Sequence, residues 1–412
     1  MRLNAMKIAL VYDCCYPWTK GGGEKTLWDI AVGLRARGHL VHIFCVKLWE
    51  GPAVIERERI MLHGVCRATG FYGRDGRRTL LQPLLFAGGL FKTFWKGETF
   101  DCIYCTVFPF FSVFSVWFYR ILQRCPPPWV LAWLEVWGRD YWNRYTKSRV
   151  RGAIGAAIER LCSRCCRHHT VLSPLHAGRL QRLLGVAPER IEIIPRGLDL
   201  QKIDCAKAKH SGRVIYVGRL VDYKNVEIVL RAWSKVLQSC PDATFRILGA
   251  GPELNQLSRL RTRLGLEKCV EFIEPLQSWE DIMNEIATAQ ILVQPSIREG
   301  QSVVALEAMA VGTAVVATRH PESAVADILR DRVNGLLVKD WNDSSMWAER
   351  LAELLAQPAL RQRLANAARQ DVQSFDWETK IAPRLEHLFA QVAADCKCVR
   401  PTANLENQSV PS

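Results

Sequence analysis

The chain has 412 residues, of which 49% are hydrophobic and 23% charged, with a formal net charge of +14. This composition is that of a soluble globular protein and excludes a disordered chain, while the length exceeds one ordinary core and predicts two domains. Fifteen cysteines, an odd number, argue against a disulfide framework, and no secretory signal precedes the first apolar segment, so we expect a reduced, cytoplasmic protein.

Strand and helix patterns alternate along the first half of the chain. A strand is predicted over residues 7–12, a loop over 13–23, an amphipathic helix ended by Gly38, and a strand over 40–46. Further strands are predicted over 101–106, 130–134, 169–172 and 191–194. Residues 50–98 show no regular pattern and are expected to be irregular.

Residues 102–119 carry no charge over eighteen positions, the lower limit for a membrane-spanning helix. Pro109 interrupts this segment, and its first five residues favour a strand. We therefore favour a buried strand, a proline turn and a buried helix over a spanning helix.

The second half repeats the alternation. Strands are predicted over 214–218, 245–248, 270–273, 290–294 and 314–317, and a last helix over 376–394. Strands that alternate with helices predict a parallel sheet covered by helices. The expected fold class is α/β with two Rossmann-like domains, over 1–196 and 197–375, followed by the helix at 376–394 and a disordered tail at 395–412.

The most informative stretch holds two carboxylates, Glu299 and Glu307, eight residues apart. Glu299 falls in a loop after a predicted strand, where open α/β sheets bind ligands, and Ser302 is a good N-cap for the helix that contains Glu307. The N-terminus of that helix is suited to a phosphate. The alternative is a loop acid and a solvated helical acid.

Three glycine-containing turns accompany these carboxylates. Gly21-Gly22-Gly23-Glu24 and Gly249-Ala250-Gly251-Pro252 each lie between a strand and a helix, where glycine allows the backbone to approach a ligand. Gly218-Arg219-Leu220-Val221-Asp222-Tyr223-Lys224 follows a strand directly and places two cations within reach of a diphosphate. Plain tight turns and solvated cations are the alternatives.

In this order, the motifs resemble the retaining glycosyltransferases of family 4, which have the GT-B fold of two Rossmann-like domains across a cleft. The resemblance covers about residues 6–394. It implies that Arg219 and Lys224 neutralise the diphosphate of a nucleotide-sugar, and that Glu299 orients the transferred sugar. It also implies a donor site to which Gly22, Gly23, Gly251, Ser302, Val303, Val304 and Glu307 contribute.

Three departures from the family pattern stand out. Arg196 replaces a frequent asparagine, and Arg319-His320 stands where a glycine pair is common. Leu134 occupies the position where a first-domain histidine is expected. Glu135 beside it is the residue that would take over part of that role on the sugar or acceptor side.

The expected mechanism stabilises charge on the leaving nucleoside diphosphate with Arg219, Lys224 and the helix N-terminus. No Asp-x-Asp pair accompanies these loops, so no metal and no cofactor are expected. The predicted reaction moves a hexose, for example mannose, with retention. The alternatives are a nucleotide-sugar epimerase and a non-catalytic nucleic-acid or phosphate-binding protein, although no nucleic-acid module is present.

Residues 139–167 contain eight arginines and lysines against two acids, near a group of aromatic residues. Basic charge with interfacial aromatics predicts peripheral attachment to an anionic membrane, and hence a glycan or lipid-linked acceptor in cell-envelope polysaccharide synthesis. The aromatics in question are Trp129, Trp133, Trp137, Tyr141 and Trp142. A zinc site at Cys162, Cys165, Cys166, His168 and His169 is the weaker interpretation, because no second cluster pairs with it.

Overall fold

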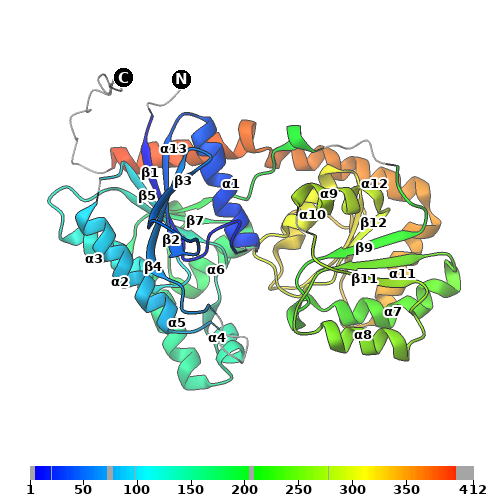
Figure 1. The fold of residues 1–412 in the computed structure, drawn as a ribbon. Helices are drawn as coiled ribbons and strands as arrows, with labels where there is room; N and C mark the ends of the chain where they lie inside the picture. The colour runs from blue at the N-terminus through cyan, green and yellow to red at the C-terminus, as the bar shows by residue number, and fades with distance from the viewer. Residues whose placement is uncertain are drawn as a thin grey trace. The chain divides into compact units, whose positions relative to one another are not determined.

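The structure, a computed structural model, describes residues 5–19, 21–71, 78–97, 99–203, 208–276 and 278–395. It contains an eight-stranded and a six-stranded sheet (Figure 1). The predicted tail lies outside the described residues, apart from residue 395. Two compact units are present. One comprises Met1–Ala132, Ala157–His169 and Leu385–Ser412, and the other comprises Trp133–Ala156 and Thr170–Arg384.

The eight-stranded sheet has the strand order β3-β4-β2-β1-β5-β6-β7-β8. The pairs β1–β2, β1–β5, β2–β4 and β5–β6 are parallel, and β3 pairs with β4 in an antiparallel hairpin. The strands are β1 (Lys7–Val11), β2 (Leu40–Lys47), β3 (Val54–Arg57), β4 (Ile60–Arg67), β5 (Cys102–Thr106), β6 (Trp129–Trp133), β7 (His169–Val171) and β8 (Ile191–Ile193).

Six helices accompany this sheet: α1 (Gly22–Ala36), α2 (Leu81–Lys96), α3 (Phe111–Ile121), α4 (Gly138–Thr146), α5 (Arg149–Cys165) and α6 (Pro174–Leu184). The prediction that residues 50–98 are irregular is wrong, because β3, β4 and α2 lie there. The strand–turn–helix order predicted for residues 102–119 is confirmed by β5 and α3, but α3 is not a buried helix, because Phe118 exposes 51% of its surface. No helix among the described residues is long and apolar enough to cross a membrane.

The six-stranded sheet is entirely parallel, with the order β11-β10-β9-β12-β13-β14. Its strands are β9 (Arg213–Val217), β10 (Thr244–Leu248), β11 (Val270–Ile273), β12 (Ile291–Gln294), β13 (Ala314–Thr318) and β14 (Leu336–Val338). Its helices are α7 (Val226–Ser239), α8 (Leu254–Arg263), α9 (Trp279–Thr288), α10 (Val303–Ala310), α11 (Ser344–Ala356) and α12 (Pro358–Asp371).

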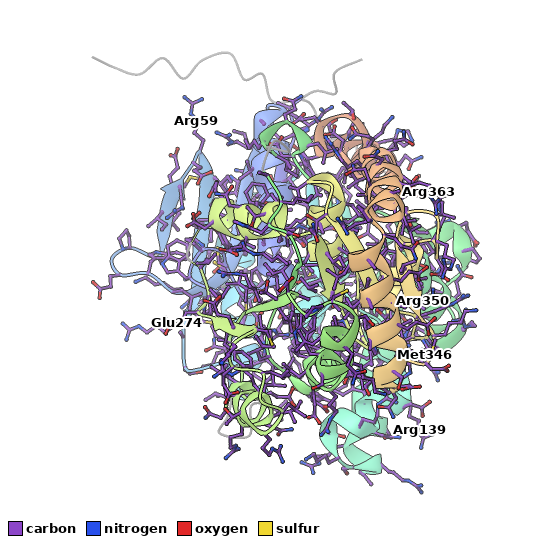
Figure 2. All side chains as sticks on the ribbon, turned by 90° about the vertical axis from the view of Figure 1, so that its right-hand side faces the viewer. Arg59, Arg139, Glu274, Met346, Arg350 and Arg363 are labelled. Carbon is purple, nitrogen blue, oxygen red and sulfur yellow. The ribbon has the colours of Figure 1, made fainter. Side chains whose placement is uncertain are left out.

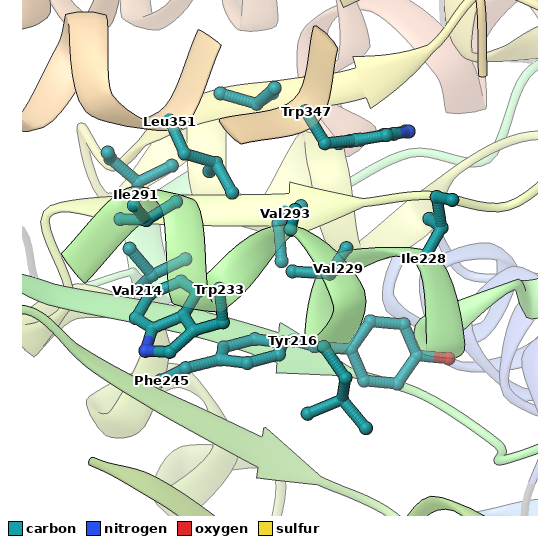
Figure 3. Packing of buried hydrophobic residues seen from close by; sticks show 14 of the residues in the cluster. Val214, Tyr216, Ile228, Val229, Trp233, Phe245, Ile291, Val293, Trp347 and Leu351 are labelled. Atoms are coloured by element: carbon teal, nitrogen blue, oxygen red, sulfur yellow. The ribbon is translucent and has the colours of Figure 1, made fainter. Parts of the chain in front are cut away.

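Both faces of the six-stranded sheet are buried. Successive strand residues point to opposite faces, so Val214 and Tyr216 pack against α7, while Ile215 between them packs toward the core of α9 and α10. Trp233 of α7 stacks on Phe245 of β10 with ring centroids 5.0 Å apart (Figure 3). Each such fully buried apolar side chain contributes about 1.5–3 kcal/mol. Burial on both faces explains the continuous apolar runs of these strands.

The outer sides of the covering helices are charged, as Arg363 on α12 illustrates (Figure 2).

The last helix, α13 (Ala382–Ala394), follows a π-helical turn over Trp377–Ile381. Its Glu386 accepts hydrogen bonds from Arg37 at 2.7 Å and binds His39 at 2.9 Å. Its Phe389 packs edge-on against Tyr104 of β5. Residues 385–394 are thereby part of the compact unit that contains β1 and β5.

Candidate functional site

The reversal of strand order in the six-stranded sheet lies between β9 and β12, which pair in parallel. Ligands of open parallel sheets bind beyond the carboxyl ends of strands at such a point. The segment after β9 carries Arg219 and Lys224, and the segment after β12 carries Glu299 and Ser302. Two motifs that are 75 residues apart in sequence therefore meet at one edge of the sheet.

Lys224 and Glu299 form a salt bridge, with Nζ and Oε1 2.6 Å apart. Only 15% of the lysine side chain and 11% of the glutamate side chain are exposed. A cation and a carboxylate so far out of water require each other, because either alone would carry the full cost of desolvation. Glu299 does lie in a loop, between β12 and α10, but its carboxylate is buried and paired.

Glu299 is also fixed by groups other than Lys224. Nε2 of Gln294, the last residue of β12, donates to the same carboxylate oxygen at 2.5 Å. The backbone N–H of Glu299 donates to the carbonyl of Glu322, and its carbonyl accepts from Ala324 at 3.0 Å. The carboxylate is thus held in one orientation at the end of the strand. Gln294 was not singled out from the sequence, although its place as a polar residue ending a buried strand is a usable signal.

Glu307 is buried within α10, with 6% of its surface exposed. The indole N–H of Trp279, the first residue of α9, donates to its Oε1 at 2.9 Å. The alternative of a solvated helical acid is therefore wrong. The sequence did not identify Trp279 as a partner, because no motif links a tryptophan to a glutamate 28 residues later.

Ser302 is the N-cap residue of α10, as predicted, but its side chain does not cap the helix. Within the described chain, its buried hydroxyl has no hydrogen-bond partner, and neither does the buried hydroxyl of Thr318 at the end of β13. The first N–H groups of an α-helix, here those of Val303 and Val304, also lack partners within the helix. Buried polar groups without partners at a helix N-terminus are suited to bind an anionic ligand.

Arg219 is exposed, and its guanidinium donates to the hydroxyl of Tyr223 at 2.8 Å. Its carbonyl accepts from the hydroxyl of Tyr216 at 2.9 Å, which ties the loop to β9. Burial, and then the charge of Glu299, raise the pKa of Tyr216 well above its ordinary value, so this phenol stays a neutral donor. The loop thus holds a surface cation next to the buried Lys224–Glu299 pair.

Gly249 and Gly251 allow two loops to approach each other closely. A Cβ at Gly251 would lie 2.1 Å from the carbonyl oxygen of Leu220, and one at Gly249 would lie 1.9 Å from that of Gly218. The turn after β10 therefore packs directly on the loop that carries Arg219. This contact is a structural reason for Gly251, and the predicted role of Gly251 in donor binding remains a prediction.

Gly22 and Gly23 begin helix α1, with Gly21 as the N-cap residue. A Cβ at Gly22 would meet no atom within 4 Å, so no packing within the described chain requires glycine there.

Asp13, just after β1, is completely buried and accepts from Arg78 at 2.5 Å. Burial raises the pKa of Asp13, although Arg78 opposes the shift.

The segment after β6 contains Leu134 and Glu135, both half-buried. Glu135 accepts from the indole N–H of Trp137 at 3.0 Å. A histidine that the sequence analysis did not single out contacts this segment: the ring of buried His176 in α6 accepts from the N–H of Val136 at 3.1 Å. Burial, and then the charge of Arg179, lower the pKa of His176 to about 4, so its ring is neutral.

The aromatic residues expected to meet a membrane are largely buried. Trp129, Trp133 and Trp142 expose 3%, 1% and 9% of their surfaces, so this part of the membrane prediction is wrong. The basic residues of α4 and α5 are exposed, as Arg139 shows (Figure 2). Cys162, Cys166 and His169 are buried, and the described residues contain no group of three or more potential ligands placed to hold a metal ion.

Comparisons with protein families match nearly the whole length described above. Residues 201–371 match the model of the glycosyl transferases group 1, and residues 21–197 match that of the glycosyl transferase 4-like domain. Among curated proteins, the D-inositol 3-phosphate glycosyltransferase of Corynebacterium diphtheriae is 27% identical over 62% of this chain and 67% of its own length. That of Salinispora arenicola is 31% identical over 53% of each chain. The alignments thus span between half and two thirds of these relatives.

Solved structures resemble the chain over almost its full length. Sucrose-phosphate synthase from Thermosynechococcus elongatus superposes with a TM-score of 0.78 at 22% identity, over 94% of this chain and 99% of that chain. Anabaena HepE, solved in complex with UDP, gives a TM-score of 0.68 at 20% identity, over 94% of this chain and 100% of that chain. At such identities the likeness establishes the fold, and the prediction of two Rossmann-like halves of the GT-B type is confirmed.

Proposed function

Because the chain belongs to the group 1 glycosyltransferases, we propose that it transfers a hexose, such as mannose, from a nucleotide-sugar to a glycan or lipid-linked acceptor. The proposal includes retention of the anomeric configuration and a contribution to envelope polysaccharide synthesis. It also keeps residues 1–196 as the acceptor domain and 197–375 as the donor domain. The observation that carries it is the buried Lys224–Glu299 pair beside the N-terminus of α10.

In this reaction the bond between the anomeric carbon and the diphosphate oxygen breaks, and the electron pair stays on the diphosphate. Lys224, the exposed Arg219 and the N–H groups of Val303 and Val304 supply positive charge for it. An ammonium group has three donors, so Lys224 can keep its bond to Glu299 while it binds a phosphate oxygen. The acceptor hydroxyl then attacks from the same face and passes its proton to a phosphate oxygen of the leaving group.

The two glutamates take different parts in this proposal. Glu299 is held by Gln294 and Lys224, which leaves the rest of its carboxylate to accept from sugar hydroxyls and orient the ring. Glu307 is oriented by Trp279 and would accept from the ribose hydroxyls. Because UDP is bound in solved Anabaena HepE, uridine diphosphate sugars are the first donors to test.

The test is to measure binding and turnover of a panel of nucleotide-sugars by calorimetry and product analysis. We expect one donor to bind, with Glu307→Ala weakening its binding at least about tenfold and Lys224→Ala reducing turnover more than binding. Glu349→Ala, on the exposed side of α11, is the matched control and should match the wild type. An isomerised sugar without acceptor would instead identify an epimerase, and the absence of any donor binding would refute the proposal.

A further inference from the structure

The outer sides of helices α2 and α3 are unusually apolar. More than half of the exposed large hydrophobic side chains of the described chain lie on these two helices or at their ends. We call six of them the apolar helix face: Leu81, Leu84, Leu85, Trp95, Phe118 and Ile121. Their exposed fractions run from 41% to 57%. Contiguous exposed apolar surface of this kind marks an interaction site in a globular protein.

The spacing places the exposed apolar residues of α2 on one side of the helix. On α2, Leu81, Leu84, Leu85 and Trp95 fall at positions i, i+3, i+4 and i+14, which is one side of an α-helix. The opposite side of α2 packs inward through Phe86, Leu90 and Phe94 and is completely or almost completely buried. The exposed leucines are therefore not required by the core, because a separate set of residues builds it.

Aromatic rings join the two helices into one surface. Phe91 stacks on Trp95 with centroids 5.9 Å apart and lies 6.2 Å from Phe118 of α3. Figure 1 shows α2 and α3 side by side, in cyan, on the same side of the eight-stranded sheet. Trp95 and Phe118 remain more than half exposed within this contact.

The charges on helices α2 and α3 themselves have one sign. No acidic residue occurs between Leu80 and Gly97 or between Cys102 and Leu134, and the sequence places Glu98 and Asp101 in the segment between α2 and β5. Exposed cations are present at Lys92 and Lys96 on α2 and at Arg124 after α3. A second copy of this chain would bring these like charges together, since a two-fold interface pairs a patch with itself. The charges instead complement an anionic partner.

We propose that the apolar helix face docks on the surface of an anionic lipid bilayer. Leucine side chains and a tryptophan ring enter the headgroup region, while Lys92 and Lys96 extend to lipid phosphates around them. This assignment moves the membrane contact away from Trp129, Trp133 and Trp142, which are buried, to helices whose apolar residues are exposed. It does not depend on the transfer reaction, because adsorption to lipid needs neither donor nor acceptor.

The test is co-sedimentation of the full chain with vesicles of phosphatidylcholine alone or of equimolar phosphatidylcholine and phosphatidylglycerol. We expect binding to the anionic vesicles that high salt weakens. Lys92→Ala with Lys96→Ala should weaken it about fivefold per cation, and Leu84→Glu with Leu85→Glu by about tenfold or more. Val333→Glu, at an exposed valine in the unit that holds the six-stranded sheet, is the matched control and should bind as the wild type does.

The lysine variant keeps the experiment decisive if the leucine variant fails to fold, because both lysines are exposed and outside the core. Thermal unfolding and donor binding of each variant report separately on folding and on the donor site. The proposal is overturned if the wild type does not bind anionic vesicles, or if both variants bind as tightly as the wild type. A wild-type dimer that the leucine variant dissociates would also overturn it, in favour of a second copy as the occupant.

Discussion

The carboxyl ends of β9 and β12 differ from that of β1, although all three strands border a reversal of strand order in a parallel sheet. Beyond β9 and β12, the buried Lys224–Glu299 pair adjoins the exposed Arg219 and the N-terminus of α10. Beyond β1, the completely buried Asp13 is paired with Arg78. The first region has an exposed cation beside its ion pair, whereas in the second the charge of the buried Asp13 is neutralised by Arg78.

Aromatic rings lie beside the cations of both ion pairs. The guanidinium of Arg78 lies over the rings of Phe71 and Phe108, at 5.1 and 5.4 Å from their centroids, and contacts the sulfur of Cys14. Lys224 also lies near an aromatic ring, 5.6 Å from the centroid of Tyr223, and its partner Glu299 accepts a further hydrogen bond from Gln294. A leaving diphosphate needs cations and N–H groups, and in the proposed function the segment after β9 and the N-terminus of α10 supply both.

The largest expected effect concerns Arg78. Arg78→Ala leaves Asp13 without its cation at a position with no exposed surface, which should cost about 3–5 kcal/mol of unfolding free energy. Denaturant titration of the variant measures this loss. Arg57→Ala, whose ion pair with Glu58 spans 4.0 Å at the surface, is the control and should change stability by less than about 1 kcal/mol. If Arg78→Ala remained stable but lost transfer activity, the Asp13–Arg78 pair would serve the reaction rather than the fold.

The second effect concerns Lys224. Lys224→Ala should lower kcat about 10²–10³-fold, because it removes a preorganised cation from the charge that develops on the diphosphate. Steady-state transfer at saturating donor measures the change. Lys235→Ala, at a lysine of α7 that donates to Ser345, is the matched control and should keep the wild-type rate. If Lys224→Ala lowered the stability of the protein without changing kcat, Lys224 would have a structural role, as Arg78 does.

The β9–β12 region was largely predictable from sequence, because its charged residues directly follow buried strands. Gly218-Arg219 directly follows β9, and Glu299 follows β12. Because these neighbouring strands are parallel, both segments lie at the same edge of the sheet. Trp279 was not predicted, since its contact with Glu307 depends on how α9 and α10 pack, and Gln294 was not singled out although it is a polar residue that ends a buried strand. The Asp13–Arg78 pair joins residues 65 positions apart with no motif around them, so the local sequence does not predict the pair.

The fold shows the same limit of sequence reasoning. Alternating buried strands and amphipathic helices were predictable wherever one side of an element is apolar. The segment over β3, β4 and α2 was missed because β3 is mostly exposed, and because α2 is apolar on its exposed side as well as its buried side. A helix without a polar side has no helical periodicity to detect.

The third effect concerns Gly22, where the described structure leaves room for a side chain. Gly22→Ala should leave stability unchanged, because its Cβ meets no atom within 4 Å. If the donor phosphates approach this helix start, the same methyl group should lower kcat/KM about tenfold to a hundredfold by displacing them. Comparing unfolding midpoints with transfer rates separates the two effects. Unchanged kinetics would remove Gly22 from the donor site.

The smallest effect concerns pH and again distinguishes the two sheets. His42 of β2 and His63 of β4 stack with ring centroids 5.1 Å apart, and Nδ1 of His42 lies 2.9 Å from Nε2 of His63. Burial, and then nearby positive charge, lower the pKa of each from 6.5 to about 4. Below pH 6.5 these histidines bind protons in the unfolded chain but not in the folded chain. Their contribution to the free energy of unfolding is therefore full above pH 6.5 and is lost as pH falls toward 4.

Replacing one ring tests this assignment. His63→Phe keeps an aromatic ring next to Phe44 and removes one titrating group, so its stability should fall less steeply with pH in this window than that of the wild type. Unfolding of both proteins at about pH 7 and about pH 5 measures the difference. Because the pair lies in the eight-stranded sheet, the transition of that sheet should shift while that of the six-stranded sheet stays in place. Equal pH slopes in the two proteins would show that other groups carry the acid sensitivity.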